Sequence, residues 1–521
     1  MQTRNLTVSA SAALVAMLFA ISSCTLIYEP SDDNATGGDQ APPGGDPDFL
    51  GLVLNSVEPP ALFEGEGGSL LAPAVPVVVY GVGIAADATL SIALANGAGL
   101  PELPLVVDKT HVSADGTIAA TAVRLPVVEW LTDGDVLDAV ITLTQGDESA
   151  SIPWNIVGLD ELIVTEPLLS IDILLNDLFS IIIFDHPTHI IGAKPARLFA
   201  TQEIIINALV DVDGLSLDGL GGAGSCPGGG PAQSAPCGPG SGGGGTNHLL
   251  SLLGLGGGGG GFGLPGQDGA GGGGAGLAGL ITGDSMLSLL SGLTDTIGNR
   301  GGGGGGGGSS ILGLDLGIAL GGAGGCSGGI IELTSGGLIH FGENGAVSAR
   351  GEDGETVTGA GGGGGGSGGG ILLRARVGII VEGDAGERLN AEGGSGGDGT
   401  YRGGDGGDGR IRIDIPTATP PQLADSPQPH YGPMWSLSLL PITNDAAPVT
   451  ELFGQGAHPF SLSLSGLPLL NDSQFNDSGV ASVTTPLEAG LNIVCAVVDI
   501  LDRVDLSRPE ASNCISIAYL P

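Results

Sequence analysis

The chain has 521 residues, among them 101 glycines and 33 prolines, and its formal net charge is −41. A surface this acidic repels nucleic acid and anionic lipid head groups, which argues against DNA or RNA as a partner. The mean hydropathy is nevertheless positive, whereas disordered acidic chains combine high charge with low hydrophobicity. We therefore expect an ordered all-β protein with several domains and a low-complexity region.

Residues 1–23 have the anatomy of a signal peptide, because Arg4 precedes an apolar stretch that runs from Leu6 to Ala20. This stretch is too short for a permanent membrane helix. The sequence from Ile21 to Cys24 resembles the lipobox of bacterial lipoproteins. The resemblance implies cleavage before Cys24 and attachment of fatty acyl chains such as palmitate to it. An ordinary secretory signal followed by a chance cysteine is the alternative.

Residues 24–48 contain Asn, Asp, Gly and Pro throughout, which is typical of a flexible spacer. Thr25, rather than an aspartate, directly follows the cysteine. This resembles the sorting pattern of outer-membrane lipoproteins. We expect an exported protein that is anchored by lipid to the outer membrane or cell surface of a Gram-negative bacterium.

Residues 49–160 alternate apolar and polar positions in short runs separated by turn residues, which predicts an Ig-like β-sandwich. The opening segments Ser56–Pro60 and Gly65–Gly68 resemble the start of IPT/TIG immunoglobulin-like domains. That resemblance implies a spacer or a binding module.

Residues 161–415 contain short apolar strands between glycine tracts, and Ile331, Ile371 and Ile411 are spaced by 40 residues. Strands that recur at a fixed period and end at glycine predict a glycine-rich parallel β-helix, or solenoid. Tracts such as 301–308 would be either mobile or arranged as polyglycine II strands. In the solenoid, Ile371 and Leu373 would point inward. Four arginines would face water or acidic neighbours: Arg374, Arg376, Arg410 and Arg412.

Residues 416–433 form a Pro-rich linker, and residues 434–521 return to alternating strands that predict a second, small Ig-like β-sandwich. Cys495 and Cys514 fall in two neighbouring strands of this domain. In an oxidising compartment they would form a disulfide worth about 3 kcal/mol.

A second disulfide, closing a small loop, is expected between Cys226 and Cys237, which leaves Cys326 unpaired. A zinc site is the weaker interpretation, because the chain has no Cys-x-x-Cys pair and no histidine at ligand spacing nearby.

Two groups of residues resemble metal sites. Asp398, Asp405 and Asp408 end Gly-rich units that resemble half-turns of calcium-binding repeats. Loose counterion binding at an acidic surface is the alternative, and no other cofactor is expected. His186 and His189 lie beside Asp185, where they could hold a metal or simply belong to a solvated turn.

Catalysis is not expected. The segments 365–369 and 393–397 match the letters of a hydrolase nucleophile motif, but glycine tracts produce such matches by chance and the required strand-turn-helix context is missing. No Gly-Lys-Ser/Thr phosphate loop is present either.

The lipobox, the segment 204–214 and the repeated unit of glycine block and strand together resemble glycine-rich surface lipoproteins of myxobacteria and their relatives. We therefore expect a lipid-anchored surface scaffold or adhesion protein without catalytic activity, whose partners are the outer membrane, surface polysaccharide or other cells. The alternative is a polysaccharide-binding or polysaccharide-degrading β-helix protein, because parallel β-helices often host such functions. Ice or mineral binding by flat polyglycine faces is a third hypothesis.

Overall fold

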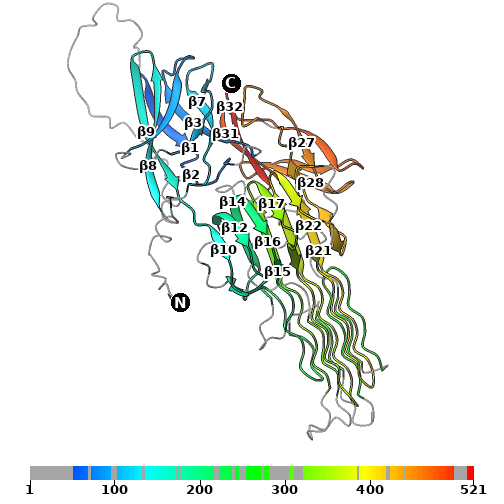
Figure 1. Cartoon of the computed structure of the whole chain (residues 1–521). Helices are drawn as coiled ribbons and strands as arrows, with labels where there is room; N and C mark the ends of the chain where they lie inside the picture. Colours follow the sequence, from blue (N-terminus) through cyan, green and yellow to red (C-terminus); the bar gives the residue numbers. More distant parts are fainter. Residues whose placement is uncertain are drawn as a thin grey trace, which may run out of the picture.

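The computed structural model is all-β, as predicted: every regular element in the described residues is a strand, and none is an α-helix (Figure 1). Among these residues no helix is long and apolar enough to cross a bilayer. The described residues are 51–68, 72–95, 103–128, 130–131, 135–171, 174, 178–215, 222–236, 241–245, 254–271, 275–280, 304–309, 321–383, 387–417, 423–438, 440–497 and 513–521.

The N-terminal module, residues 51–157, consists of two sheets that share one apolar core. One sheet has the order β1-β3-β7-β5, with β6 beside β7, and the other has the order β2-β9-β8-β4. Alternate side chains of β8 are buried, as expected for a strand with one face on a core. The strands are β1 (Val53–Glu58), β2 (Ala61–Phe63), β3 (Val75–Val82), β4 (Thr89–Leu94), β5 (Val106–Val107), β6 (His111–Val112), β7 (Ile118–Arg124), β8 (Val136–Gln145) and β9 (Glu148–Val157).

The parallel stack, residues 162–431, contains a nine-stranded and a six-stranded sheet in which every pairing is parallel. The nine-stranded sheet runs β10-β12-β14-β16-β19-β22-β24 with β17 and β20 alongside, and the other runs β11-β13-β15-β18-β21-β23. The strands are β10 (Leu162–Val164), β11 (Leu168–Ser170), β12 (Leu178–Phe184), β13 (Thr188–Ile191), β14 (Ala196–Ile206), β15 (Leu209–Asp211), β16 (Ile330–Ser335), β17 (Leu338–Phe341), β18 (Ala346–Ser348), β19 (Gly370–Ala375), β20 (Gly378–Val381), β21 (Glu387–Asn390), β22 (Arg410–Asp414), β23 (Ala424–Ser426) and β24 (His430–Tyr431).

The spacing of 40 residues is the repeat of this stack. Ile331 pairs in register with Ile371, which pairs in register with Ile411, and all three side chains are fully buried. Val347 and Leu389 of the six-stranded sheet belong to the same core cluster, so the two sheets bury their apolar rows against one another. Each strand is too short to bury a core alone, and stacking therefore supplies the stability.

The four arginines do not face water, which corrects one expectation. Arg374, Arg376, Arg410 and Arg412 are all more than nine-tenths buried, because the outer face of the nine-stranded sheet is covered. Arg410 lies over the ring of Phe262, 5.5 Å from its centroid.

Arg374 and Arg412 do meet acidic neighbours. Arg412 Nε donates to Asp414 Oδ1 at 2.8 Å, and Arg374 Nε donates to Asp414 Oδ2 at 3.2 Å. Arg374 also lies 3.4 Å from Glu332, and Asn513 Nδ2 from the C-terminal module donates to Asp414 at 3.1 Å. Burial raises the pKa of Asp414, but the two guanidinium groups and these hydrogen bonds outweigh it and hold the pKa below its usual value.

The C-terminal module, residues 434–521, has a three-stranded and a five-stranded sheet around one core. Their orders are β25-β27-β30 and β26-β32-β31-β28-β29. The strands are β25 (Met434–Trp435), β26 (Ile442–Thr443), β27 (Val449–Phe453), β28 (Pro459–Leu464), β29 (Leu467–Gln474), β30 (Val480–Thr484), β31 (Gly490–Val497) and β32 (Cys514–Tyr519).

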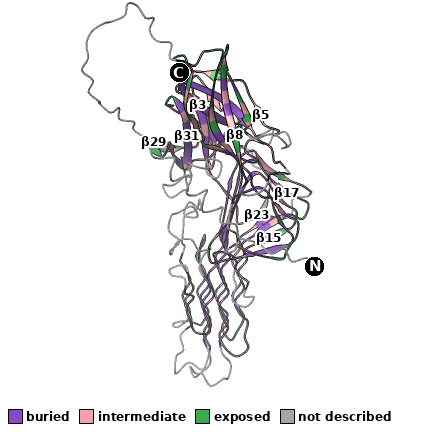
Figure 2. Cartoon of the chain, turned by 90° about the vertical axis from the view of Figure 1, so that its left-hand side faces the viewer, coloured by how far each residue is buried: buried purple, intermediate pink, exposed green. Residues whose placement is uncertain are grey.

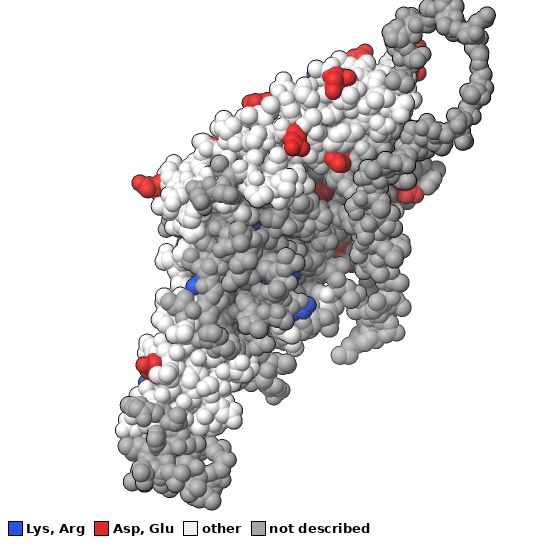
Figure 3. Space-filling model, turned by 180° about the vertical axis from the view of Figure 1, so that it is seen from behind, with Lys and Arg blue, Asp and Glu red and all other residues white. Residues whose placement is uncertain are grey.

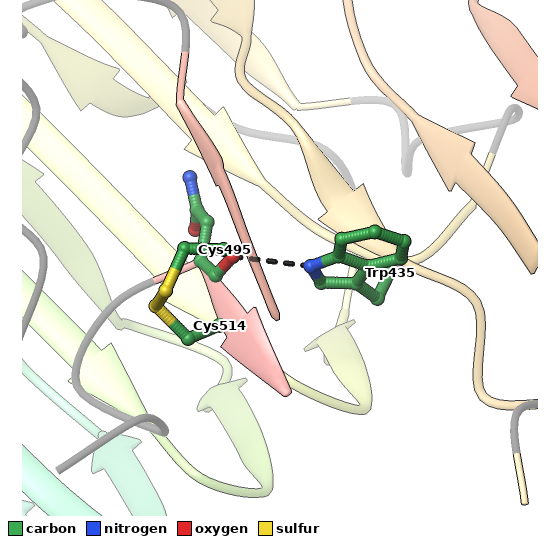
Figure 4. Close-up of a disulfide and its surroundings, with 4 residues drawn as sticks. Trp435, Cys495 and Cys514 are labelled. Carbon is green, nitrogen blue, oxygen red and sulfur yellow. Dashed lines mark hydrogen bonds between the residues drawn. A yellow bond between two sulfur atoms is a disulfide. The ribbon is translucent and has the colours of Figure 1, made fainter. Parts of the chain in front are cut away.

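The predicted disulfide between Cys495 and Cys514 is present and joins β31 to β32. Trp435 lies beside it, and its indole Nε1 donates to the carbonyl oxygen of Asn513 at 3.1 Å (Figure 4). The disulfide and this hydrogen bond fix Asn513, whose side chain reaches Asp414. The C-terminal module is thereby connected to the end of the parallel stack.

The two terminal modules also contact each other. Val78 of β3 and Ala518 of β32 belong to one small apolar cluster, and the amide of Leu491 donates to the phenol oxygen of Tyr80 at 3.0 Å. Both modules therefore form a joint head at one end of the stack (Figure 1).

A carboxyl group occupies an apolar row at the other edge of the stack. Asp425 of β23 pairs in register with Leu389, which continues the row of Val347. Burial, and to a smaller degree the charge of Glu387, raises the pKa of Asp425 to about 7. Burial, and to a smaller degree the charge of Asp425, raises the pKa of Tyr431.

We expect Asp425→Asn to raise the melting temperature at pH 8 and to leave it unchanged at pH 4. The folded state holds a proton on Asp425 up to about pH 7, whereas the unfolded chain loses it near pH 4. The wild-type protein therefore loses stability as the pH rises through this window, and the neutral amide avoids that loss. Thermal unfolding of both proteins at both pH values measures the effect, with the exposed Asp87→Asn as control. An equal shift at both pH values would contradict the prediction.

Candidate functional site

Glycine segments leave the parallel stack and return to it. The chain runs out after β18 through 349–357, returns through 360–369 to β19, and repeats the excursion after β21 through 391–398 and 401–409. The segment between β15 and β16 is much longer, and its described parts are 212–215, 222–236, 241–245, 254–271, 275–280, 304–309 and 321–329. Together these segments form a bundle of parallel rods that extends away from the head (Figure 1), and we call it the glycine bundle.

The hydrogen bonds of the glycine bundle repeat every three residues. Segment 360–369 is buried throughout and belongs to no strand, apart from one isolated bridge between Gly361 and Tyr401. Buried stretches run along the rods of the bundle in Figure 2. A period of three is the period of the polyglycine II helix, in which successive N–H groups point in three directions. Its N–H groups accordingly reach three neighbours: Gly362, Gly365 and Gly368 donate to 401–407, Gly361 and Gly364 to 306–309, and Gly363, Gly366 and Gly369 to 349–355.

The carbonyl groups of the same segment reach three further neighbours. They accept hydrogen bonds from 254–260, 321–328 and 391–397. Segment 360–369 is therefore surrounded by six strands. Segment 254–260 is also surrounded by six, namely 241–245, 264–270, 276–279, 304–309, 360–369 and 401–407. The glycine bundle is thus a hexagonal lattice of polyglycine II strands, which is one of the two states that the sequence predicted for such tracts.

This lattice leaves little room for side chains in its interior. A Cβ atom built on Gly364 would overlap the carbonyl oxygen of Gly258, and one built on Gly362 would overlap that of Gly397. Glycine therefore allows the close approach at these positions, and the buried exceptions are small, such as Ser327 and Ser367.

Side chains are present where a strand lies at the bundle surface. In 392–408 a residue with a side chain recurs at nearly every third position, and this period of three is the signal of a polyglycine II strand with one outward row. The same residues also match the spacing of calcium-binding repeats, which is how the sequence was interpreted above. The members of the row include Glu392, Ser395, Asp398, Asp405 and Asp408.

Outward carboxylates of the bundle, in this row and in 352–355, accept hydrogen bonds from backbone amides of an adjacent strand. The amide of Ser395 donates to Asp353 at 2.6 Å, and those of Ala323 and Cys326 donate to Glu355 and Glu352 at 2.8 and 2.9 Å. An amide at the lattice edge lacks one neighbouring strand, and an acidic side chain replaces the missing carbonyl. The acidic composition therefore has a structural use here.

The three predicted calcium ligands lie in this outward row. Asp405 accepts the amide of Gly396 at 2.7 Å and pairs with Arg402 at the same distance, and Asp408 accepts the amide of Gly393 at 3.2 Å. Asp398 is exposed and lies 3.7 Å from Arg402. In the described part of the chain no three His, Cys, Asp or Glu side chains are placed to share a metal ion. Calcium binding stays a prediction.

The cysteines of the bundle differ in state. Cys226 is disulfide-bonded, and its predicted partner Cys237 lies outside the described residues, as does Cys24. Cys326 is free and buried. Burial raises the pKa of its thiol to about 11, and the nearby Glu352 carboxylate adds to the shift although the backbone of Gly228 opposes it.

The histidines that could have held a metal are separated by the fold. His186 lies in the exposed turn between β12 and β13, while Asp185 accepts a hydrogen bond from Asn207 at 2.6 Å. His189 lies in β13, and its Nδ1 contacts the Asp211 carboxylate of β15. Because β15 pairs with β18 and β18 with β21, a polar row runs across the outer face of the six-stranded sheet: His189, Asp211, Ser348, Asn390 and Ser426.

We expect Gly364→Ala to destabilise the protein by about 1–3 kcal/mol, which is typical of overpacking. The added methyl group must displace the Gly258 carbonyl or break its hydrogen bond. Chemical denaturation measures the free energy of unfolding. Gly230→Ala is the matched control, because its methyl group would meet only the flexible end of the Gln233 side chain. Equal stability of the two variants would contradict the six-neighbour lattice.

We expect Cys326 to resist alkylation by a maleimide at pH 8 in the native protein, because its thiol is buried and protonated. Unfolding in guanidinium without reductant should expose it to rapid labelling. Peptide mass spectrometry identifies the labelled residue. Fast labelling of Cys326 in the native protein would show that this part of the bundle opens.

Comparison with known proteins found no matching family model, no matching curated protein and no matching solved structure. Function is therefore inferred from the geometry of this chain and from the motifs of its sequence.

Proposed function

We propose that the protein is a lipid-anchored surface scaffold that presents the glycine bundle for adhesion, and that it has no catalytic activity. The glycine bundle is the observation that carries this proposal. Its interior strands are joined by backbone hydrogen bonds in six directions, so it is a stiff projection. A stiff projection suits display at a distance from the anchor.

The domain types are part of the proposal. We take the N-terminal and C-terminal modules as Ig-like β-sandwiches, since each has two sheets around one core. We take the parallel stack as a β-solenoid from which the bundle branches. The lipobox at Cys24, the spacer 24–48 and an outer-membrane location complete the proposal; these residues precede the described part.

On the described part of the face drawn in Figure 3, acidic side chains are distributed singly. Their use as acceptors for edge amides in the bundle gives them a structural reason. Both observations favour a scaffold over an enzyme that needs clustered acids.

A polysaccharide-binding or polysaccharide-degrading protein is the second candidate. The polar row from His189 to Ser426 favours it, because it crosses successive coils as a carbohydrate groove would. Burial raises the pKa of Asp213, which accepts the Ser348 hydroxyl at 2.6 Å next to this row. Hydrolysis of pectin, alginate or an exopolysaccharide by the purified protein would favour this candidate over the scaffold.

We expect metabolic labelling with an alkynyl palmitate to tag the wild-type protein and not Cys24→Ser. Fatty acylation of that cysteine would hold the protein on the membrane, because two or three acyl chains anchor stably. Membrane fractionation of producing cells supplies the second readout, and Cys326→Ser, which removes a buried thiol, is the control. A wild-type protein without fatty acid on its first residue would refute the anchor.

Adhesion is tested on producing cells. We expect a chain deletion and Gly364→Ala to reduce attachment to surfaces or to other cells, with Gly230→Ala retaining it, because the proposal assigns adhesion to an intact bundle. Wild-type attachment of the deletion strain would refute the adhesive role.

A further inference from the structure

A polar pocket lies where the last strands of the parallel stack meet two loops of the C-terminal module. It measures about 190 Å³ and is open to solvent, which is smaller than the roughly 300–1,000 Å³ of sites for drug-sized ligands and limits the ligand to about one small ring. The stack contributes Thr417 and Tyr431, and the loops contribute Gln455, Asp477 and Ser478. The remaining wall is largely glycine.

Tyr431 is held in a defined position at this pocket. Tyr431 pairs in register with Ile413, and its side chain packs against the apolar core at the end of the stack. Its amide donates to Gln455 Oε1 at 3.2 Å, while the amide of Gln455 donates to the Tyr431 carbonyl at 2.8 Å. This reciprocal pair fixes the backbone of Tyr431 relative to Gln455.

The opposite rim is rigid as well. The side chain of Asn476 accepts the amides of Ser478 and Val480, both at 3.0 Å, and the Ser478 hydroxyl at 2.7 Å. This turn places Asp477 at the pocket with an exposed carboxylate. The described residues give that carboxylate no hydrogen-bond partner, and they give none to Gln455 Nε2.

An aromatic ring beside a planar amide and a carboxylate suits a ligand that has an apolar face and a rim of hydroxyl groups. A sugar ring has this form, since its C–H face can lie on an aromatic ring and its hydroxyls can donate to a carboxylate and accept from an amide. Asp477 is the charged residue of the lining. A uronic acid would bring a second negative charge to it and bind less well.

We propose that this pocket binds a neutral sugar unit of a surface polysaccharide, with Tyr431 as the platform and with Gln455 and Asp477 as hydrogen-bonding partners. The proposal rests on the adhesive function and names its ligand class. It adds a sugar site at the junction of stack and head to the adhesive role of the bundle.

The test uses the full chain in detergent and the methyl glycosides of glucose, galactose and mannose, with galacturonic acid as the charged probe. We expect saturation-transfer NMR to detect at least one neutral glycoside and titration calorimetry to give its Kd. Asp477→Ala should weaken that Kd about tenfold, as loss of a hydrogen bond to a charged group does. Gln455→Ala is the second variant. The exposed Glu451→Ala on β27 of the same module is the matched control and should bind as the wild type.

The proposal is overturned if none of the three neutral glycosides binds, if galacturonic acid binds as tightly, or if Asp477→Ala and Glu451→Ala give the same Kd. Producing cells separate it from the proposed function. Loss of sugar binding in vitro with full attachment of Asp477→Ala cells would remove the pocket from adhesion and leave the scaffold intact. Failure of lipid attachment would refute the anchored scaffold, while the titration would still decide the sugar pocket.

Discussion

The glycine bundle depends on one constraint: its buried backbone amides and carbonyls must be paired, and the six-neighbour lattice brings them together by using glycine at nearly every interior position, with a few buried serines such as Ser367. A buried backbone N–H or C=O group left without a hydrogen-bond partner costs on the order of 1–3 kcal/mol. Segment 360–369 meets the constraint by sending its groups to six strands. The high glycine content is therefore a requirement of close approach. The hydrogen bonds that this approach permits offset the conformational entropy lost when glycine is ordered.

The same constraint explains much of the surface. Where the lattice ends, amides lose a neighbouring strand, and residues such as Asp353, Glu355 and Asp405 accept their hydrogen bonds. Pro265, on an outer strand, has no amide to satisfy. Carboxylates are acceptors only, so they suit this task, and they also keep bundles of different molecules apart by charge. The acidity that argued against nucleic acid at the sequence level thus has a second, local cause.

The bundle needs a base that sets the register of its strands, and the parallel stack supplies it. Rows such as Ile331, Ile371 and Ile411 fix the coils relative to one another, and each coil then delivers its glycine segments at matching heights. The buried ions around Asp414 join the last coil to the C-terminal module. Such a network adds less free energy than its charges suggest, because the ions lose their hydration. Its geometric value is that it fixes the head, and with it the pocket at Tyr431, on the end of the stack.

The sequence by itself determined the all-β class, the repeat of 40 residues and the bond between Cys495 and Cys514, because each depends on a local pattern: alternation, a fixed period, or two cysteines in adjacent strands. The period of three in 392–408 is likewise a local pattern of the sequence. Only the tertiary structure decided that Arg374 and Arg412 are buried, since the groups that cover and pair with them, such as Asn513, come from distant segments. The six-neighbour lattice was likewise beyond the sequence. Its hydrogen bonds join residues as far apart as Gly257 and Gly362, and one glycine tract carries no side-chain information about which other tract lies beside it.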